Sequence, residues 1–350
     1  MSLAYGVLRD GGVCARVDGR VVELSALDPN FDAHSLNPFM AAGPDAWREA
    51  RERVGEGREL SDAELGMPFE VADYVDFYSS LHHATNLGRM FRPGAEPLLP
   101  NWRHLPVGYH GRSGTVVPSG TPVRRPRGQL PGPVFGPSAR LDIELEAGFA
   151  IGTPSALGEP VPVERALDHV FGMVLVNDWS ARDIQAWEYQ PLGPFLGKSF
   201  ATSVSHWVVP LDELAGRRVP GEPQDPAPLE YLREDPWAYD IPLEVELNGT
   251  VVARSNTRHL YWSIAQQVAH LTANGASLRT GDLLATGTIS GPGREERGSL
   301  IELSWNGEEP IELADGSTRT FLEDGDEVVL RGDPLGEVRG RIEPALRAPA

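Results

Sequence analysis

The sequence contains a single cysteine, Cys14, among its 350 residues. One thiol cannot form an intrachain disulfide or a cysteine metal cage, which favours a reducing compartment. The first residues, Met1 to Ala4, lack the basic and apolar segments of a signal peptide. Apolar runs also stay shorter than the roughly 18 residues that a membrane helix needs. We therefore expect a soluble cytoplasmic protein with no membrane partner.

Basic residues are scarce as well. The chain has 31 lysines and arginines against 50 acidic residues, a formal net charge of −19. This excess opposes binding to nucleic acid or to anionic membranes, because both would be repelled. It is compatible with carboxylates that hold cations, and a local cluster of Arg or Lys could still bind an anionic substrate.

Several common catalytic signatures are also absent. The sequence has no G-x-S-x-G, no H-E-x-x-H, no P-loop and no G-x-G-x-x-G that opens a helix. Serine-hydrolase, zinc-protease, nucleotide and dinucleotide chemistry are therefore poorly supported.

Glycine (38) and proline (31) are plentiful and separate many short β-branched segments. Short β-branched segments separated by Gly and Pro are typical of a mainly β protein. In a leading unit over residues 1–68 we expect a small β-barrel with a packing role. Its strands are expected at Tyr5–Leu8, Val13–Val17 and Arg20–Leu24, and one helix at Asp45–Val54. The Asp18-Gly19 pair is a strong hairpin signal. The second domain spans 71–350.

In this second domain we expect strands at Asp73–Ser80, Thr115–Pro118, Leu141–Phe149, Ile241–Leu247, Leu283–Ile289, Leu300–Trp305 and Glu327–Arg331. The segment Pro210–Asp235 is predicted to be a surface loop. A longer helix should follow Ser255-Asn256 and end at Asn274-Gly275, because residues 260, 264, 268 and 271 form an apolar stripe.

The stretch from Phe171 to Ser199 gathers unusually varied functional groups. Phe171–Val176 predicts a buried strand, and Ser180 is then expected to cap a short helix. The side chains at 182, 185 and 189 should share one face of it, whereas Ile184 and Trp187 should point into the core. The groups collected here are those of Asp178, Arg182, Gln185, Tyr189 and Lys198. A solvated polar face is the alternative.

A second group of polar residues lies on the strand at Leu141–Phe149, where Asp142, Glu144 and Glu146 alternate with apolar residues. These acids form either a solvated face beside basic neighbours or half of an oxygen-only site for a hard divalent cation. Asp76 and Asp178, at the edges of predicted strands, could complete such a site. From pattern alone, either His82 or His83 could be a general base.

Long strings of residues resemble the fumarylacetoacetase (fumarylacetoacetate hydrolase) family. They are Asp73–Ser80 with His83-Ala84-Thr85-Asn86, Leu99–Trp102, Leu105–Arg112, Asn177–Phe200, Gly281–Gly291 and Glu302–Trp305. The resemblance implies a small N-terminal SH3-like barrel, here shortened, followed by a larger C-terminal domain of mixed β-roll type. It also implies a homodimeric, metal-dependent enzyme that hydrolyses a carbon–carbon bond of fumarylacetoacetate in tyrosine and phenylalanine catabolism.

The resemblance also implies a role for individual residues. His83 would be the base oriented by Glu302, and oxyanion stabilisation would come from Arg182, Gln185 and Lys198. Substrate contacts would be Tyr78, Arg92, Tyr109, Gln185, Tyr189 and Thr288. Ca²⁺ or Mg²⁺, with Mn²⁺ as an alternative, would be bound by Asp76, Glu144, Glu146 and Asp178.

A second, structural Mg²⁺ would be held by Asp178, Lys198 and Thr202, although Ala201 stands where the family often has Gly. Two alternatives remain at this stage. Relatives on the same fold act as acylpyruvate hydrolases, decarboxylases or isomerases, and a metal-stabilised dimer without activity is conceivable. The presence of both His83 and Glu302 disfavours the inactive dimer.

Overall fold

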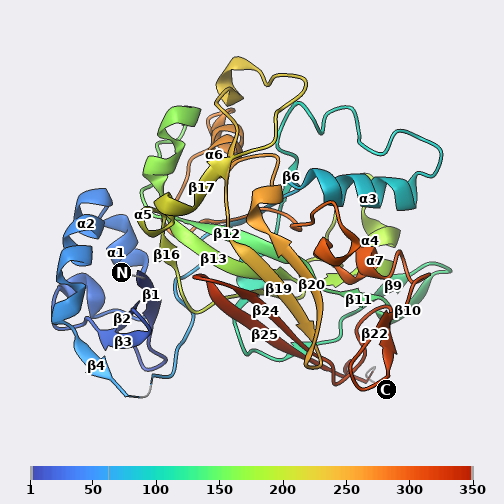
Figure 1. The fold of residues 1–350 in the computed structure, drawn as a ribbon, viewed down its shortest axis with the longest axis horizontal. Helices are drawn as coiled ribbons and strands as arrows, with labels where there is room; N and C mark the ends of the chain where they lie inside the picture. The colour runs from blue at the N-terminus through green and yellow to red at the C-terminus, as the bar shows by residue number, and fades with distance from the viewer. Residues whose placement is uncertain (1–2, 62, 348–350) are drawn as a thin grey trace.

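The structure is a computed structural model that describes residues 3–61 and 63–347. It is mainly β, with a small N-terminal β domain beside a larger domain (Figure 1). The N-terminal sheet has the antiparallel order β1-β2-β3-β4. Its elements are β1 (Leu3–Val7), β2 (Val13–Val17), β3 (Arg20–Glu23), β4 (Arg58–Leu60), α1 (Asn37–Ala41) and α2 (Pro44–Arg53). The strands and the helix predicted here are confirmed, and Asp18 and Gly19 form the hairpin turn with positive φ angles of 47° and 85°.

An eight-stranded sheet forms the centre of the larger domain. Its order is β6-β5-β21-β12-β13-β15-β7, and β16 pairs with β13 outside this path. The strands are β5 (Tyr74–Phe77), β6 (Gly108–His110), β7 (Val116–Pro118), β12 (Leu145–Ile151), β13 (Val170–Asp178), β15 (Thr202–Val204), β16 (Val209–Pro210) and β21 (Leu283–Ala285). Every residue of β12 and β13 is buried, because both faces of the sheet are covered.

A second sheet of five strands has the order β20-β19-β24-β25-β8. Its strands are β8 (Val123–Arg124), β19 (Pro242–Leu247), β20 (Thr250–Asn256), β24 (Glu327–Gly332) and β25 (Gly336–Glu343). Two-stranded pairs are formed by β9 (Arg127–Leu130) with β10 (Val134–Pro137), β11 (Leu141–Asp142) with β14 (Ser180–Ala181), β17 (Arg218–Pro220) with β18 (Trp237–Tyr239), and β22 (Ile311–Glu312) with β23 (Thr318–Arg319).

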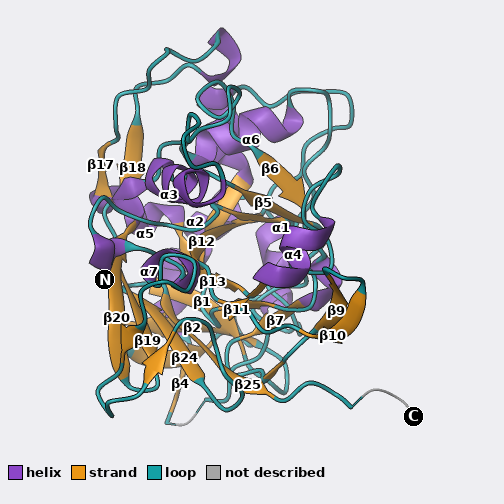
Figure 2. Cartoon of the chain, turned by 90° about the vertical axis from the view of Figure 1, so that its right-hand side faces the viewer, coloured by secondary structure: helices purple, strands orange, loops and turns teal. Residues whose placement is uncertain are grey.

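The helices of the larger domain lie around these sheets (Figure 2). They are α3 (Leu81–Phe91), α4 (Arg182–Glu188), α5 (Leu211–Leu214), α6 (Ile264–Thr272) and α7 (Leu300–Leu303). No helix within 3–61 and 63–347 is long and apolar enough to cross a bilayer. The two domains share a core, since Tyr5 and Phe39 pack on Phe171 of β13 with ring centroids 5.9 and 5.5 Å apart. The division into 1–68 and 71–350 stays a prediction.

Several local predictions were wrong. The expected strand at 141–149 is split, because the Asp142 carboxylate and the Asn177 side chain accept the amides of Ile143 and Glu144 and so interrupt the ladder. The expected strand at 300–305 is a short helix over 300–303 followed by a turn. Asn256 caps only a 3₁₀ turn, whereas α6 begins at Ile264, with a capping box at Ser263.

Other differences concern the central stretch. Ser180 pairs in a short strand and its hydroxyl donates to Asp178 O, so α4 begins at Arg182 without a side-chain cap. Ile184 is buried as expected, but Trp187 is 47 % exposed. The predicted loop at Pro210–Asp235 contains α5 and β17.

Candidate active site

His83 lies in the first turn of α3. The chain leaves β5 at Phe77, and the Ser80 side chain accepts the His83 amide at 3.3 Å, so the helix begins here. The strand expected at Asp73–Ser80 therefore ends at Phe77, and the two histidines lie on a helix, where alternation along a strand does not decide which of them turns inward. The buried His83 places its Nδ1 2.6 Å from Glu302 Oε2, whereas His82 faces Glu222 at 3.5 Å and is more exposed.

Glu302 is fully buried on α7, and four side chains form hydrogen bonds with its carboxylate. Besides His83, the hydroxyls of Ser290 and Ser299 donate to Oε2 at 2.9 and 2.7 Å, and Asn86 Nδ2 donates to Oε1 at 2.9 Å. Burial opposes ionisation of this carboxyl, but His83 and these hydrogen bonds prevail and lower its pKa to about 2. Glu302 is thus an ionised acceptor that holds the His83 ring. Sequence reasoning missed Asn86, Ser290 and Ser299, because isolated amides and hydroxyls carry no pattern.

Four carboxylates converge beside this pair. Those of Asp76, Glu144, Glu146 and Asp178 each offer an oxygen within 4.8 Å of the others, and all four residues are buried. Pairing within the sheet explains why they meet. Ala285 of β21 aligns with both Asp76 and Gly148, and Glu146 aligns with Val176, so the ends of β5 and β13 lie beside the start of β12.

Two cations offset part of this charge. Lys198 Nζ binds Glu144 and lies 2.8 Å from Asp178 Oδ2, and Arg182 Nη1 lies 2.8 Å from Glu144 Oε1. Burial would raise the pKa of Glu144, but the two cations lower it overall. Arg182 Nε also binds Asp142 Oδ2 at 2.8 Å. Asp142 was predicted only as part of the acidic strand face, and its contact with Arg182 depends on the fold.

Asp76 and Glu146 are less well compensated than Glu144. Both oxygens of Glu146 and Oδ1 of Asp76 are buried with no hydrogen-bond partner in the described chain. The pKa of each carboxyl is raised well above its usual value, by burial first and then by the neighbouring acids, Asp178 for Asp76 and Asp76 for Glu146. An all-oxygen set with unpartnered buried carboxylates fits a hard divalent cation, whose charge would satisfy them.

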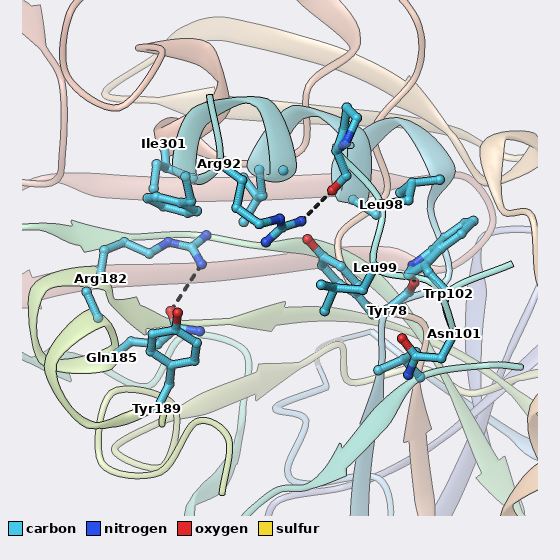
Figure 3. A pocket seen from close by; sticks show the side chains of 17 residues that line it. Tyr78, Arg92, Leu98, Leu99, Asn101, Trp102, Arg182, Gln185, Tyr189 and Ile301 are labelled. Atoms are coloured by element: carbon cyan, nitrogen blue, oxygen red, sulfur yellow. Dashed lines mark hydrogen bonds between the residues drawn. The ribbon is translucent and has the colours of Figure 1, made fainter. Parts of the chain in front are cut away.

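A cavity of about 460 Å³ lies in the larger domain (Figure 3), and its lining residue Arg182 binds Glu144 of the acidic cluster. Of the predicted site residues it is lined by Tyr78, Arg92, Arg182, Gln185 and Tyr189. The side chains of α4 form one wall, with Arg182 Nη1 donating to Gln185 Oε1 at 3.4 Å, and Arg92 and Tyr78 lie opposite. Tyr78 also packs edge-on against the His83 ring, with centroids 5.2 Å apart. The shared face predicted for 182, 185 and 189 is confirmed.

The other predicted site residues do not line this cavity, and among them are Tyr109, Thr202 and Thr288. The Tyr109 hydroxyl donates to Asp178 Oδ2 at 3.0 Å, and its ring borders a separate cavity of about 450 Å³ together with Lys198. Thr202 donates to Asp178 Oδ1 at 2.8 Å. Thr288 is buried, and its hydroxyl has no partner within 3–61 and 63–347. The roles expected for these residues stay predictions.

Comparison with known proteins gives concordant matches. Residues 74–343 match the family model described as fumarylacetoacetate (FAA) hydrolase C-terminal. The chain is 50 % identical over 355 residues to the fumarylacetoacetase of Rattus norvegicus, covering 90 % of this chain and 85 % of the relative. It is 47 % identical over 358 residues to that of Arabidopsis thaliana, covering 91 % and 84 %.

Solved structures with the same fold are more distant in sequence. The fumarylacetoacetate hydrolase of Exiguobacterium antarcticum aligns with a TM-score of 0.64 and 19 % identity over 98 % of this chain and 100 % of that one. The maleylpyruvate hydrolase of Sphingobium, solved in complex with manganese(II) ion and pyruvate, aligns at 0.60 with 16 % identity over 98 % and 100 %. These likenesses establish the fold.

Proposed function

Because the chain belongs to the fumarylacetoacetate hydrolase family, we propose that it hydrolyses a carbon–carbon bond of fumarylacetoacetate to give fumarate and acetoacetate. The observation that carries this proposal is the buried His83–Glu302 pair together with four converging carboxylates. Both groups adjoin one cavity through its lining residues, since Tyr78 packs on His83 and Arg182 binds Glu144. Hydrolysis of a β-diketone needs a base for water, positive groups for the developing alkoxide, and stabilisation of a carbanionic leaving group. The site has a candidate for each.

His83 is the proposed general base. Its Nδ1 faces the ionised Glu302, so Nε2 is the nitrogen left to accept a proton from water. The water oxygen then bonds to the carbonyl carbon, and Glu302 stabilises the imidazolium that forms. When the carbon–carbon bond breaks, its electron pair stays on the departing carbon, which takes the proton back from His83.

Arg182 is the proposed donor to the developing alkoxide. It lines the cavity, and its Nη2 has no partner among the residues that the structure describes. The neighbouring carboxylates keep the guanidinium charged by raising its pKa, although burial opposes this. Gln185 lies beside Arg182, and Lys198 contributes a second buried positive charge.

The acidic cluster is the proposed cation site, with Ca²⁺ or Mg²⁺ as the expected ion and Mn²⁺ as an alternative. Asp76, Glu144, Glu146 and Asp178 would hold it, in keeping with the oxygens of Asp76 and Glu146 that have no partner in the described chain. A divalent cation bound there would supply Lewis-acid stabilisation of negative charge on the diketone oxygens. For a second Mg²⁺ we keep the expected ligands Asp178, Lys198 and Thr202 as the proposal.

Arg92 is the proposed anchor for a substrate carboxylate. It lies at the end of α3, its Nη2 donates to Pro97 O, and its buried Nε has no partner in the described residues. The guanidinium therefore has a free donor in the cavity wall. Tyr78 and Tyr189 add hydroxyl groups on either side, while Tyr109 would need to turn toward the substrate from its contact with Asp178, and the Thr288 hydroxyl, without a partner among the described residues, lies outside the cavity lining.

We also propose that the enzyme is a cytoplasmic homodimer that works in tyrosine and phenylalanine catabolism. The single cysteine supports a reducing compartment. Exposed apolar side chains support a self-association surface, since Phe195 and Leu196 border the same cavity as Arg127, whose guanidinium stacks on the exposed Phe135. Light scattering of the purified protein tests the dimer.

The activity is tested by the loss of ultraviolet absorbance from fumarylacetoacetate, with simpler acylpyruvates measured in parallel, before and after chelation. We expect hydrolysis of fumarylacetoacetate at a higher kcat/KM than any acylpyruvate, and its loss on chelation. Turnover of acylpyruvates alone would reassign the substrate, and no hydrolysis by the metal-replete protein would refute the proposed function.

A further inference from the structure

Asp142 is a fully buried carboxylate that joins two separate parts of the site. Its Oδ2 accepts Arg182 Nε at 2.8 Å and the amide of Ile301 at 3.1 Å. Its Oδ1 accepts the amides of Leu300 and Ile143 at 2.7 and 2.8 Å. The four donors leave this carboxylate fully satisfied in a site where the neighbouring Glu146 has no partner among the described residues.

The short helix α7 depends on this contact. The helix has four residues, and its N-cap Ser299 makes no side-chain cap because its hydroxyl donates to Glu302 instead. The first amides of a helix lack partners within the helix, and leaving them buried without an acceptor is costly. Asp142, which lies 158 residues before Leu300, accepts the first two. The backbone that carries Glu302 is thus anchored by the same carboxylate that binds Arg182.

The contact also sets the orientation of Arg182. Asp142 takes Nε and Glu144 takes Nη1, both at 2.8 Å, so two edges of the planar guanidinium are fixed. The one remaining nitrogen, Nη2, has no partner in the described chain, and the side chain lines the cavity. Rotation of the guanidinium would turn that donor away from the cavity.

We propose that Asp142 is a positioning residue for the hydrolysis. It holds the oxyanion donor Arg182 and the Glu302-bearing helix in a fixed relation, so that the alkoxide is stabilised where His83 delivers water. This inference rests on the function proposed above. Its effect passes through groups that act in the transition state, and misplacement of such groups by about 1 Å can reduce the rate about 100-fold.

The test compares Asp142→Asn with Asp326→Asn. Asp326 is also buried and also accepts an arginine and a backbone amide, from Arg319 Nε at 2.9 Å and Glu323 N at 2.7 Å, but it is not part of the site. The amide nitrogen of Asn cannot accept, so each variant leaves a donor unsatisfied. We expect kcat per folded, metal-loaded enzyme to fall about 100-fold in Asp142→Asn, with KM little changed. Asp326→Asn should lose thermal stability and keep kcat.

Double variants separate positioning from a general loss of packing. If Asp142 acts through its two partners, Asp142→Asn should cost much less activity in an Arg182→Ala or a Glu302→Gln background than in the parent. Independent, multiplying losses in both backgrounds would overturn the proposal. So would an unchanged kcat in Asp142→Asn, or an equal fall in Asp326→Asn.

Asp142→Glu covers the case in which Asp142→Asn fails to fold. It keeps the charge but displaces both oxygens, so the same fall in kcat at nearly constant KM is expected, and normal kcat would refute positioning. The parent enzyme is assayed first with fumarylacetoacetate. An inactive parent would count against the proposed function, whereas an active parent with an active, folded Asp142→Glu would count against positioning alone.

Discussion

Replacing His83 by alanine should separate activity from stability. The imidazole is buried, and its Nδ1 lies 2.6 Å from Glu302, so no exposed group can replace it as the base without rearrangement. Loss of a general base reduces kcat by about 10²–10⁴-fold. This corresponds to about 3–5 kcal/mol of transition-state stabilisation.

The cost in stability should be smaller. Without His83, the Glu302 carboxylate keeps three donors, from Asn86 at 2.9 Å, Ser290 at 2.9 Å and Ser299 at 2.7 Å. The folded state then loses one hydrogen bond to a charged group, about 1.5–3 kcal/mol. With an unfolding entropy of about 2.1 cal/mol/K per residue, a 350-residue chain should melt about 2–4 °C lower.

The matched control is His82→Ala on the same helix turn, where the imidazole faces Glu222 at 3.5 Å nearer the surface. Both variants are assayed for kcat on fumarylacetoacetate, for bound metal by elemental analysis, and for melting by circular dichroism. His83→Ala should stay folded and metal-loaded while losing kcat, and His82→Ala should keep it. Glu302→Gln should lose much of the same activity without adding to the His83→Ala loss. Near-normal kcat in His83→Ala with a loss in His82→Ala would refute the assignment of the base.

Three further outcomes are expected. Arg92→Ala should raise KM for acidic diketones far more than for a neutral β-diketone, because the guanidinium would bind the substrate carboxylate. Replacing the exposed Arg89 by alanine should not have this effect. An equal rise in KM for both substrates would show that Arg92 does not bind the carboxylate. Chelation should abolish activity, and Ca²⁺, Mg²⁺ or Mn²⁺ should restore it; full activity after chelation, with no metal detected, would contradict this. Glu146→Gln should weaken metal binding yet raise the melting temperature of the chelated protein, because it removes a carboxyl whose ionisation is opposed by burial and by the neighbouring acids. The pKa of Glu302 is lowered from 4.5 to about 2, so its ionised form stabilises the fold above pH 4.5. The advantage in unfolding free energy over Glu302→Gln should therefore shrink as pH falls from 4.5 toward 2 in urea titrations, and a constant difference would contradict it.

Local features of the molecule were predictable because they depend on neighbours in the chain. The Asp18-Gly19 hairpin follows from residues that tolerate positive φ. The shared face of Arg182, Gln185 and Tyr189 follows from helical spacing, and all three line the cavity. The strings that resemble a known family also predicted which residues to examine, including His83 over His82.

Contacts between distant segments were decided only by the tertiary structure. A two-residue period shows that Asp142 and Glu146 share a strand face, but it cannot show that one binds Arg182 and that the other lacks a partner in the described chain. The same limit explains why the strand expected at 141–149 is split, since the Asp142 carboxylate accepts the backbone amide of Ile143. Trp187 is exposed, although its place off the face of Arg182 and Gln185 suggested that it would point into the core. Glu302 reaches His83 across 219 positions because strand pairing and helix docking, whose energies come from distant partners, bring their segments together.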